Sequence, residues 1–325
     1  MASVTLVESA KLAQDQLVSG VIETIVTVDQ MFQILPFQGI DGNSLAYNRE
    51  LLEGGAGVIG VGGLISSGAT DVLLGGNTAK NAATFTQVNS NLTTIIADAE
   101  VNNLVQSTRS GDGNDQKAVQ IASKAKKVAR SYQHMLINGS GASNQFSGLL
   151  NLCPAGQTIS GAVNGTQFSS LKLLDDLMAK VKDKDGRVDY FAMNIREINA
   201  YYDLLRTLGG ASIGEVVTLP SGEQVPGYRG VPIFRNDFIP ITQTQGTATN
   251  ATTIFCGTID DGSMSTGIAG ITASKASGIN VREVGQAEDK DESITRLTWY
   301  CGLALFSELG IACADGISPT GAVYV

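Results

Sequence analysis

Residues 114–141 read NDQKAVQIASKAKKVARSYQHMLINGSG, and this stretch has the clearest periodicity in the chain. Its apolar residues recur at steps of three and four, as on one face of an amphipathic helix. They are Ala118, Ile121, Ala122, Ala125, Val128, Ala129, Tyr132, Met135 and Leu136. Asn114 or Asp115 can cap the start, and Gly139 follows the end. The pattern predicts a helix over 114–138, about 24 residues and roughly 36 Å long.

The opposite face of this helix is basic. It carries Lys117, Lys124, Lys126, Lys127, Arg130 and His134. A basic stripe can indicate nucleic-acid binding, but here no aromatic residues alternate with the charges to offer stacking surfaces. A solvated face, or a face that meets acidic groups of another subunit, is therefore the favoured interpretation.

The segment upstream of the helix is glycine-rich and has no helical or strand periodicity. It runs over Leu51–Ala83, between an extended piece at Ser44–Arg49 and a return through Phe85–Val88 and the apolar-rich Leu92–Val105. The chain contains 38 glycines, which supply turns and a permissive backbone. Loops of this length are usually functional or disordered. We therefore predict a long two-stranded loop that leaves the body of the protein and returns.

The rest of the chain predicts an α+β fold with one dominant helix. Thr5 and Glu8 form a capping box for an N-terminal helix. Leu171–Val181 is amphipathic, Val188–Met193 is typical of a buried strand, and a third helix follows Asn194. Further strands are predicted at Glu215–Leu219, Gly230–Arg235, Thr253–Thr258, Ile268–Ala273, Ile279–Val284 and Ile294–Phe306.

Composition excludes several classes of protein. The chain has 325 residues and a net charge of −9, so its surface repels phosphate backbones. It has no apolar run long enough to span a membrane, and its first residues lack the features of a signal peptide. Four scattered cysteines, without a C-x-x-C pair, indicate free thiols in a reducing compartment.

Two short motifs resemble catalytic signatures but lack the required context. Residues 55–60 match G-x-G-x-x-G, yet no βαβ unit surrounds them. Residues 210–214 match G-x-S-x-G, yet they follow a helix and precede a strand, and the only histidine, His134, lies upstream. We predict a protein that is not an enzyme, with no catalytic residues, cofactor or metal. A hydrolase or dehydrogenase remains an alternative, testable through Ser212→Ala and Gly57→Ala.

The order of these elements resembles the tailed-bacteriophage major capsid protein family, whose fold is shared with encapsulin shell proteins. The resemblance spans nearly the whole chain. Its segments are an N-terminal arm followed by Pro36-Phe37, the extended Ser44–Arg49, the glycine-rich loop, the long helix, its exit Leu136–Gly141 with Gly148–Leu150, the core piece Asp189–Asn194, and Gly230–Ile233.

The resemblance implies a division into domains. Residues 1–40 form an N-terminal arm, and 41–91 an extended loop, the E-loop. Residues 92–142 and 278–300 form a peripheral domain with the spine helix 114–138, and 143–277 and 301–325 form an axial domain. In this family axial domains meet around five-fold and six-fold axes, and the E-loop lies over the next subunit. A long glycine-rich loop cannot bury enough apolar surface alone to offset the entropy lost when it is ordered, but it can do so when it lies on a neighbouring subunit.

The implied function is a major capsid protein that assembles through hexamers and pentamers into an icosahedral shell around phage DNA. The alternative is an encapsulin-type compartment, whose inner groove would hold cargo peptides. Because the arm starts close to Met1, we expect a separate scaffolding protein, with a portal and possible decoration protein, no membrane and no sequence-specific DNA contact. The expected location is the virion, assembled in the host cytoplasm. The residues expected at intersubunit contacts are Tyr47, Arg49, Gly55, Gly57, Gly60, Gly63, Lys80, Lys124, Lys127 and Arg130.

Overall fold

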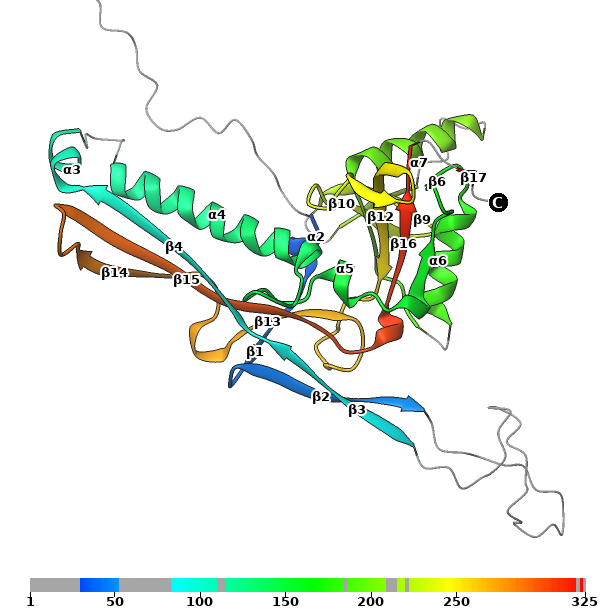
Figure 1. Cartoon of the computed structure of the whole chain (residues 1–325), viewed down its shortest axis with the longest axis horizontal. Helices are drawn as coiled ribbons and strands as arrows, with labels where there is room; N and C mark the ends of the chain where they lie inside the picture. Colours follow the sequence, from blue (N-terminus) through cyan, green and yellow to red (C-terminus); the bar gives the residue numbers. More distant parts are fainter. Residues whose placement is uncertain are drawn as a thin grey trace, which may run out of the picture. The chain divides into compact units, whose positions relative to one another are not determined.

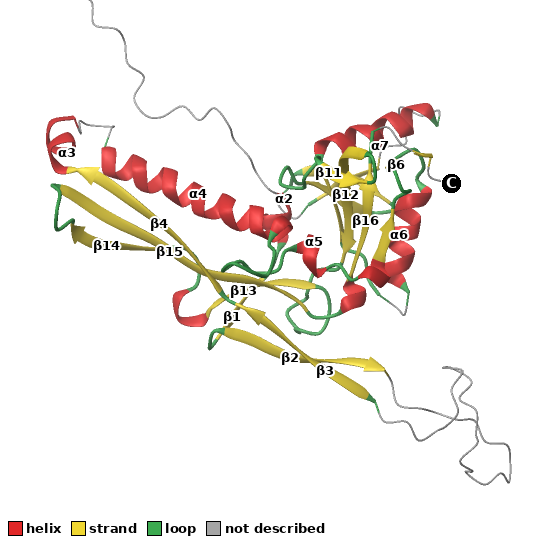
Figure 2. Ribbon diagram, in the orientation of Figure 1, coloured by secondary structure: helices red, strands yellow, loops and turns green. Residues whose placement is uncertain are grey.

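The computed structural model describes residues 30–52, 83–109, 115–183, 186–208, 215–219, 222–319 and 322–323. Within these residues the chain is a mixed α+β protein with one long helix, α4 (Gln116–Asn138), as Figures 1 and 2 show. The described strands form a five-stranded sheet, a ten-stranded sheet and a two-stranded hairpin.

The chain divides into two compact units. The first consists of residues 1–28, 96–128 and 281–298, and the second of 29–95, 129–280 and 299–325. Helix α4 and strand β15 (Glu292–Leu305) each contribute one part to the first unit and the remainder to the second.

The first unit is held together by ion pairs and side-chain hydrogen bonds between its strands and helices. It contains most of β4 (Thr93–Asn102) and β14 (Asn280–Gln286), with α3 (Asn103–Arg109). Arg296 on β15 forms a bidentate ion pair with Asp98 on β4, with Nε and Nη2 donating to the two carboxylate oxygens at 2.8 and 2.9 Å. Its hydrogen bonds hold the pKa of the Asp98 carboxyl below its usual range.

The core of the second unit is the ten-stranded sheet. Its strand order is β17-β6-β16-β12-β7-β10-β9-β8, with β11 beside β12 and β5 beside β16. The bounds of these strands are β5 Thr158–Ser160, β6 Thr166–Gln167, β7 Tyr190–Met193, β8 Glu215–Thr218, β9 Gln224–Tyr228, β10 Val231–Arg235, β11 Gln243–Gln245, β12 Ala248–Gly257, β16 Ile311–Ile317 and β17 Ala322–Val323.

Helices α6 (Lys172–Lys182) and α7 (Ile195–Thr207) pack on this sheet. Their apolar residues join Phe191 and Met193 of β7 in a single hydrophobic cluster. The alternate residues of β7, such as Tyr190, are fully buried as well. Strand β7 is therefore buried at every position, and its continuous apolar sequence is typical of a strand that is covered on both faces.

The second unit also holds the base of the predicted loop. Strands β2 (Ser44–Leu52) and β3 (Thr84–Asn91) pair antiparallel, with Tyr47 opposite Val88. In the five-stranded sheet, β1 (Phe37–Ile40) pairs parallel with β13 (Ile268–Ala273), and β13 pairs antiparallel with β15. Leu45, Tyr47 and Leu92 pack against a small core on these strands.

An aromatic cluster surrounds the second half of α4. The ring of Tyr132 lies 4.7 Å from that of Trp299, 5.3 Å from Phe146, 5.5 Å from Phe37 and 5.7 Å from Phe32, measured between centroids. Tyr132 is fully buried, and its hydroxyl donates to the Gly302 carbonyl at 3.2 Å. The cluster joins segments that are distant in sequence.

The exit of α4 requires glycine at two positions. Gly139 donates to Met135 O at 2.9 Å, and Gly148 donates to Gly139 O at 2.8 Å. A Cβ on Gly139 would lie 2.2 Å from the Phe146 carbonyl oxygen, and one on Gly148 would lie 2.5 Å from the Met135 oxygen. The backbones approach too closely for any other residue, which explains the spacing of the Asn138-Gly139 and Gly148-Leu149 motifs.

The structure agrees with the predicted fold class and corrects several details. The long helix is present, but Ala118 and Ala122 on its predicted core face are exposed, and burial begins at Val128. Leu104 and Val105, at the end of the apolar-rich return segment, lie in helix α3. Strand β16, at the centre of the large sheet, was not predicted. The division into arm, E-loop, peripheral and axial domains stays a prediction.

Candidate functional site

The base of the β2–β3 hairpin is fixed to the end of β15 by two of the predicted contact residues. Tyr47 and Arg49 are two positions apart on β2, so their side chains share one face. The Tyr47 hydroxyl donates to the Leu305 carbonyl at 2.7 Å, and its ring lies 5.3 Å from that of Phe306. The Arg49 guanidinium lies 5.5 Å from the Tyr47 ring centroid. The pair therefore acts as one anchor.

Arg49 uses all three of its nitrogens on the last residue of β15 and on two residues that follow this strand. Nε donates to the Phe306 carbonyl at 3.0 Å, and Nη2 donates to the Leu305 carbonyl. Nη1 pairs with Glu308 at 2.8 Å. The Arg49 side chain is 13% exposed and that of Glu308 is 49% exposed. The two carbonyl contacts are therefore better shielded from water than the ion pair, and they fix the hairpin base within its own subunit.

We expect Arg49→Lys to lower the free energy of unfolding by about 1–2 kcal/mol, because a lysine cannot supply a planar fork to two carbonyls. Urea unfolding of the full chain measures this loss. The matched control is Glu308→Gln, for which the expected loss is below about 0.5 kcal/mol, since an exposed ion pair contributes little. An equal or larger loss in the control would show that the ion pair, not the carbonyl contacts, holds the hairpin.

The basic face of α4 meets acidic groups of its own unit. The Lys117 ammonium pairs with Glu283 on β14, and the positive charge of Lys124 helps to lower the pKa of Asp98. Lys127 is exposed, and Arg130 is half-buried further along the helix. Acidic groups are thus present near this face at two positions within the same chain, whereas our two interpretations were a solvated face or acidic groups of another subunit.

Five of the ten predicted contact residues belong to the glycine-rich loop. Gly55, Gly57, Gly60, Gly63 and Lys80 lie outside the described residues. The structure brings Tyr47 and Arg49 together and places Lys124 and Lys127 on one helix. The first pair belongs to the second unit and the two lysines belong to the first unit. The role of all ten residues at intersubunit contacts stays a prediction.

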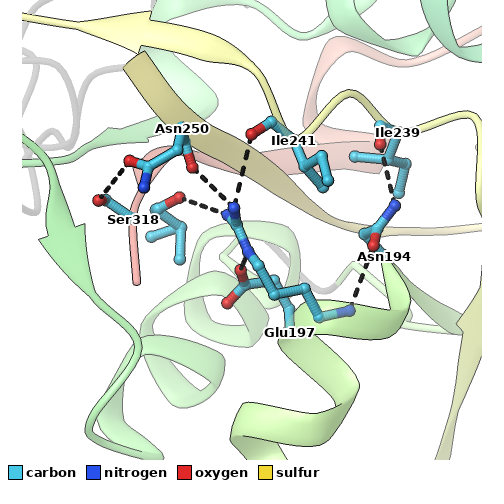
Figure 3. Close-up of polar contacts among 8 residues, drawn as sticks. Asn194, Glu197, Ile239, Ile241, Asn250 and Ser318 are labelled. Carbon is cyan, nitrogen blue, oxygen red and sulfur yellow. Dashed lines mark hydrogen bonds and ion pairs between the residues drawn. The ribbon is translucent and has the colours of Figure 1, made fainter. Parts of the chain in front are cut away.

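A second polar site, not predicted from sequence, lies at the N-terminus of α7 (Figure 3). Asn194 caps the helix, accepting from the Arg196 backbone N–H at 3.2 Å and donating to the Ile239 carbonyl at 3.1 Å. The Arg196 guanidinium donates to the Asn250 and Ile317 carbonyls at 2.7 and 3.2 Å. It thereby connects α7 to the strands β12 and β16. The only sequence signal was the Asn194 cap.

Glu197 completes this cluster as a buried acid. Its side chain pairs with Arg196 Nε at 2.8 Å and does not reach back to the helix start as a capping box requires. Burial raises the pKa of Glu197 above the ordinary value of 4.5, and the bond and charge of Arg196 offset part of this effect. A cavity of about 350 Å³ opens beside the pair, lined in part by Phe168, Asp203 and Ser318.

The raised pKa of Glu197 predicts a specific pH dependence. The folded state binds a proton more tightly than the unfolded state, so this group's contribution to stability falls as pH rises from 4.5 through the folded-state pKa. We therefore expect the stability of the parent chain relative to Glu197→Gln to decline over that range. Urea unfolding of both proteins at a series of pH values measures the difference. A relative stability that increases with pH there would contradict the burial effect.

The described residues offer no arrangement typical of metal binding. No group of three or more His, Cys, Asp or Glu side chains gathers in the part of the chain that the structure describes. His134 is exposed on α4, with its ring 6.1 Å from that of Phe238. The G-x-G-x-x-G and G-x-S-x-G motifs fall outside the described residues. None of the described helices has the length and hydropathy of a transmembrane span.

Solved structures with the same fold form shells. The chain aligns over 100% of its length with 99% of the subunit in the holo-SrpI encapsulin complex from Synechococcus elongatus PCC 7942, with a TM-score of 0.72 and 18% identity. It aligns over 98% of its length with 100% of the capsid subunit of a native GTA particle, with a TM-score of 0.67 and 13% identity. It aligns over 97% of its length with 99% of the Mycobacterium phage Ogopogo protein, with a TM-score of 0.60 and 14% identity. The fold is therefore the one shared by phage capsids and encapsulins.

Sequence comparison then assigns the family. The family model for the Type 2A encapsulin shell protein, SrpI-like, matches residues 108–316, which is well over half of the chain. This chain belongs to the SrpI-like family of Type 2A encapsulin shell proteins. No curated protein matches its sequence. It is a self-assembling shell protein and not an enzyme. The predicted fold is thereby confirmed, while the family favours the encapsulin alternative over the phage virion.

Proposed function

We propose that this chain builds an encapsulin-type compartment that encloses protein cargo inside the cell that makes it. The observation that supports this most directly is the family match over residues 108–316, which runs from the end of α3 to β16. The likeness to the subunit of the holo-SrpI encapsulin complex over the whole length of both chains is consistent with it. Shell closure then rests on copies of this chain alone.

The competing proposal, a phage capsid, makes different demands on the protein. A capsid that receives DNA requires a portal, and our expectation of a scaffolding protein belongs to that proposal. A compartment filled during assembly requires neither. The net charge of −9 fits either container, since both avoid tight binding to nucleic acid. The two proposals are therefore separated by contents and by assembly requirements.

We further propose that the loop beyond the β2–β3 hairpin makes the main contact with the next subunit. The Tyr47 and Arg49 bonds to the end of β15 fix the direction in which the hairpin leaves its own subunit. The glycines and Lys80 of the loop, with Lys124, Lys127 and Arg130 of α4, are the contact residues that we propose. Modest contacts of this kind gain strength because symmetry repeats them at every subunit.

The contents of native particles test the proposed function. Particles purified from the producing cells are treated with nuclease, then analysed for protected nucleic acid and, by mass spectrometry, for co-purifying proteins. We expect one protein in a fixed ratio to the shell subunit and no protected genome-length DNA. Protected DNA of uniform length, together with a distinct portal protein, would instead establish the phage capsid.

A further inference from the structure

Two cysteines of the second unit lie beside one threonine. Cys153 is the C-cap of α5 (Leu149–Leu152), and its backbone N–H bonds to the Leu149 carbonyl. Cys313 lies on β16, directly across from Thr158 of the parallel strand β5. The fold thus brings together two cysteines whose positions, 153 and 313, are 160 residues apart in the sequence.

The Thr158 hydroxyl holds both sulfurs. Its Oγ1 donates to the Pro154 carbonyl at 3.0 Å. The same oxygen lies 3.3 Å from Cys313 Sγ and 3.6 Å from Cys153 Sγ. Because the hydroxyl proton is directed to Pro154, the oxygen lone pairs are available to accept from the thiols.

The two thiols differ in reactivity, and both differ from the other cysteines. The neighbouring Cys313 thiol lowers the pKa of the Cys153 thiol, while Cys153 and burial raise the pKa of the Cys313 thiol. Burial raises the pKa of Cys256, and it raises the pKa of Cys301 to about 12. Cys153 is half-buried, while the other three cysteines are buried. The thiolate is the reactive form, so Cys153 is the favoured nucleophile.

We propose that Cys153 and Cys313 form a dithiol that hydrogen peroxide or a similar hydroperoxide oxidises to an intrachain disulfide. The Cys153 thiolate attacks one peroxide oxygen, giving a sulfenic acid, and the other oxygen leaves as water after taking up a proton. Cys313 sulfur then attacks the sulfenic sulfur, forming the S–S bond, and a second water leaves with the Cys313 proton. In balance, two thiols and one hydrogen peroxide give one disulfide and two waters.

The disulfide would connect α5 to the centre of the ten-stranded sheet. The contacts of Thr158 Oγ1 with both sulfurs and the pairing of β5 with β16 already link these segments. A covalent link at Cys313 closes a long chain loop, which stabilises the folded state chiefly by restricting the unfolded chain. A dithiol reductant reverses disulfide formation by thiol–disulfide exchange. The second unit of the shell protein therefore carries a reversible oxidation site.

Peptide mapping of the full-length protein tests this proposal. The chain is exposed to hydrogen peroxide, unreacted thiols are blocked with an alkylating reagent, and the digest is analysed without reduction. We expect a cross-linked peptide pair containing Cys153 and Cys313, with Cys256 and Cys301 recovered as alkylated thiols. Reduction should separate the pair, and the oxidised protein should melt at a higher temperature than the reduced protein.

Three variants make the outcome decisive. Cys153→Ser should yield no disulfide, and Thr158→Val should slow its formation, because the hydroxyl no longer holds the two sulfurs. Cys301→Ala, the matched control, should form the disulfide at the parent rate. Circular dichroism verifies that each variant is folded. Oxidation of Cys153 to a sulfinic acid without cross-linking in the parent chain, or a disulfide that involves another cysteine, would overturn the proposal.

Discussion

A variant that lacks residues 54–76 is expected to fold as a subunit and to form no closed shells. The residues that anchor the hairpin base, Tyr47 and Arg49, lie outside the deleted segment, and their partners at the end of β15 are retained. The ten-stranded sheet and the aromatic cluster are likewise untouched. If the loop contributes to contacts between subunits, its loss removes that contact at every position of the lattice at once.

Circular dichroism and urea unfolding measure folding of the deletion variant, and negative-stain electron microscopy measures assembly. A control chain in which a glycine-serine linker of equal length replaces residues 54–76 separates the role of the sequence from that of loop length. We expect this control to fold and also to form no closed shells. Closed shells from either chain would refute the proposed contact, and an unfolded deletion variant would show that the loop belongs to the subunit core.

Tyr132→Ala is expected to produce the largest loss of stability of any substitution considered. The ring is fully buried and lies within 6 Å of four other aromatic rings, between 4.7 and 5.7 Å from centroid to centroid. Removal of a large buried side chain, with the cavity it leaves, costs about 3–5 kcal/mol. The expected result is a large decrease in the urea midpoint, or a failure to accumulate folded protein.

Tyr132→Phe is the matched control because it keeps the ring and removes only the hydroxyl. The hydroxyl makes one hydrogen bond, to the Gly302 carbonyl at 3.2 Å. The expected loss is about 1 kcal/mol, the usual net value of such a bond. Similar losses for the two variants would mean that the hydrogen bond, and not ring packing, accounts for the contribution of Tyr132.

The sequence predicted those parts of the fold that depend on local periodicity or on glycine. The long helix followed from apolar residues at steps of three and four, and its exit from the glycines at 139 and 148. The periodicity placed Ala118 and Ala122 on the core face, but both are exposed in the structure. Periodicity defines a face of a helix and does not show whether another element covers that face. The apolar-rich run Leu92–Val105 did not predict the change from strand β4 to helix α3, because a short apolar run does not separate strand from helix.

The candidate sites were harder to predict, because they depend on long-range contacts. Arg49 was selected for its place in the motif, but its partners lie more than 250 residues away, at Leu305, Phe306 and Glu308. Nothing local to Arg196 indicates that it meets the carbonyls of Asn250 and Ile317. Strand β16, which holds Cys313, was missed because Ala, Cys, Asp and Gly have weak strand propensity and only burial in the sheet favours them.

Cryo-electron microscopy of this chain, produced alone in a host that lacks its natural partners, tests the central claim most directly. The account predicts closed icosahedral shells built from this subunit, with no scaffolding protein, portal or DNA required. Monomers or small oligomers under all assembly conditions would contradict it.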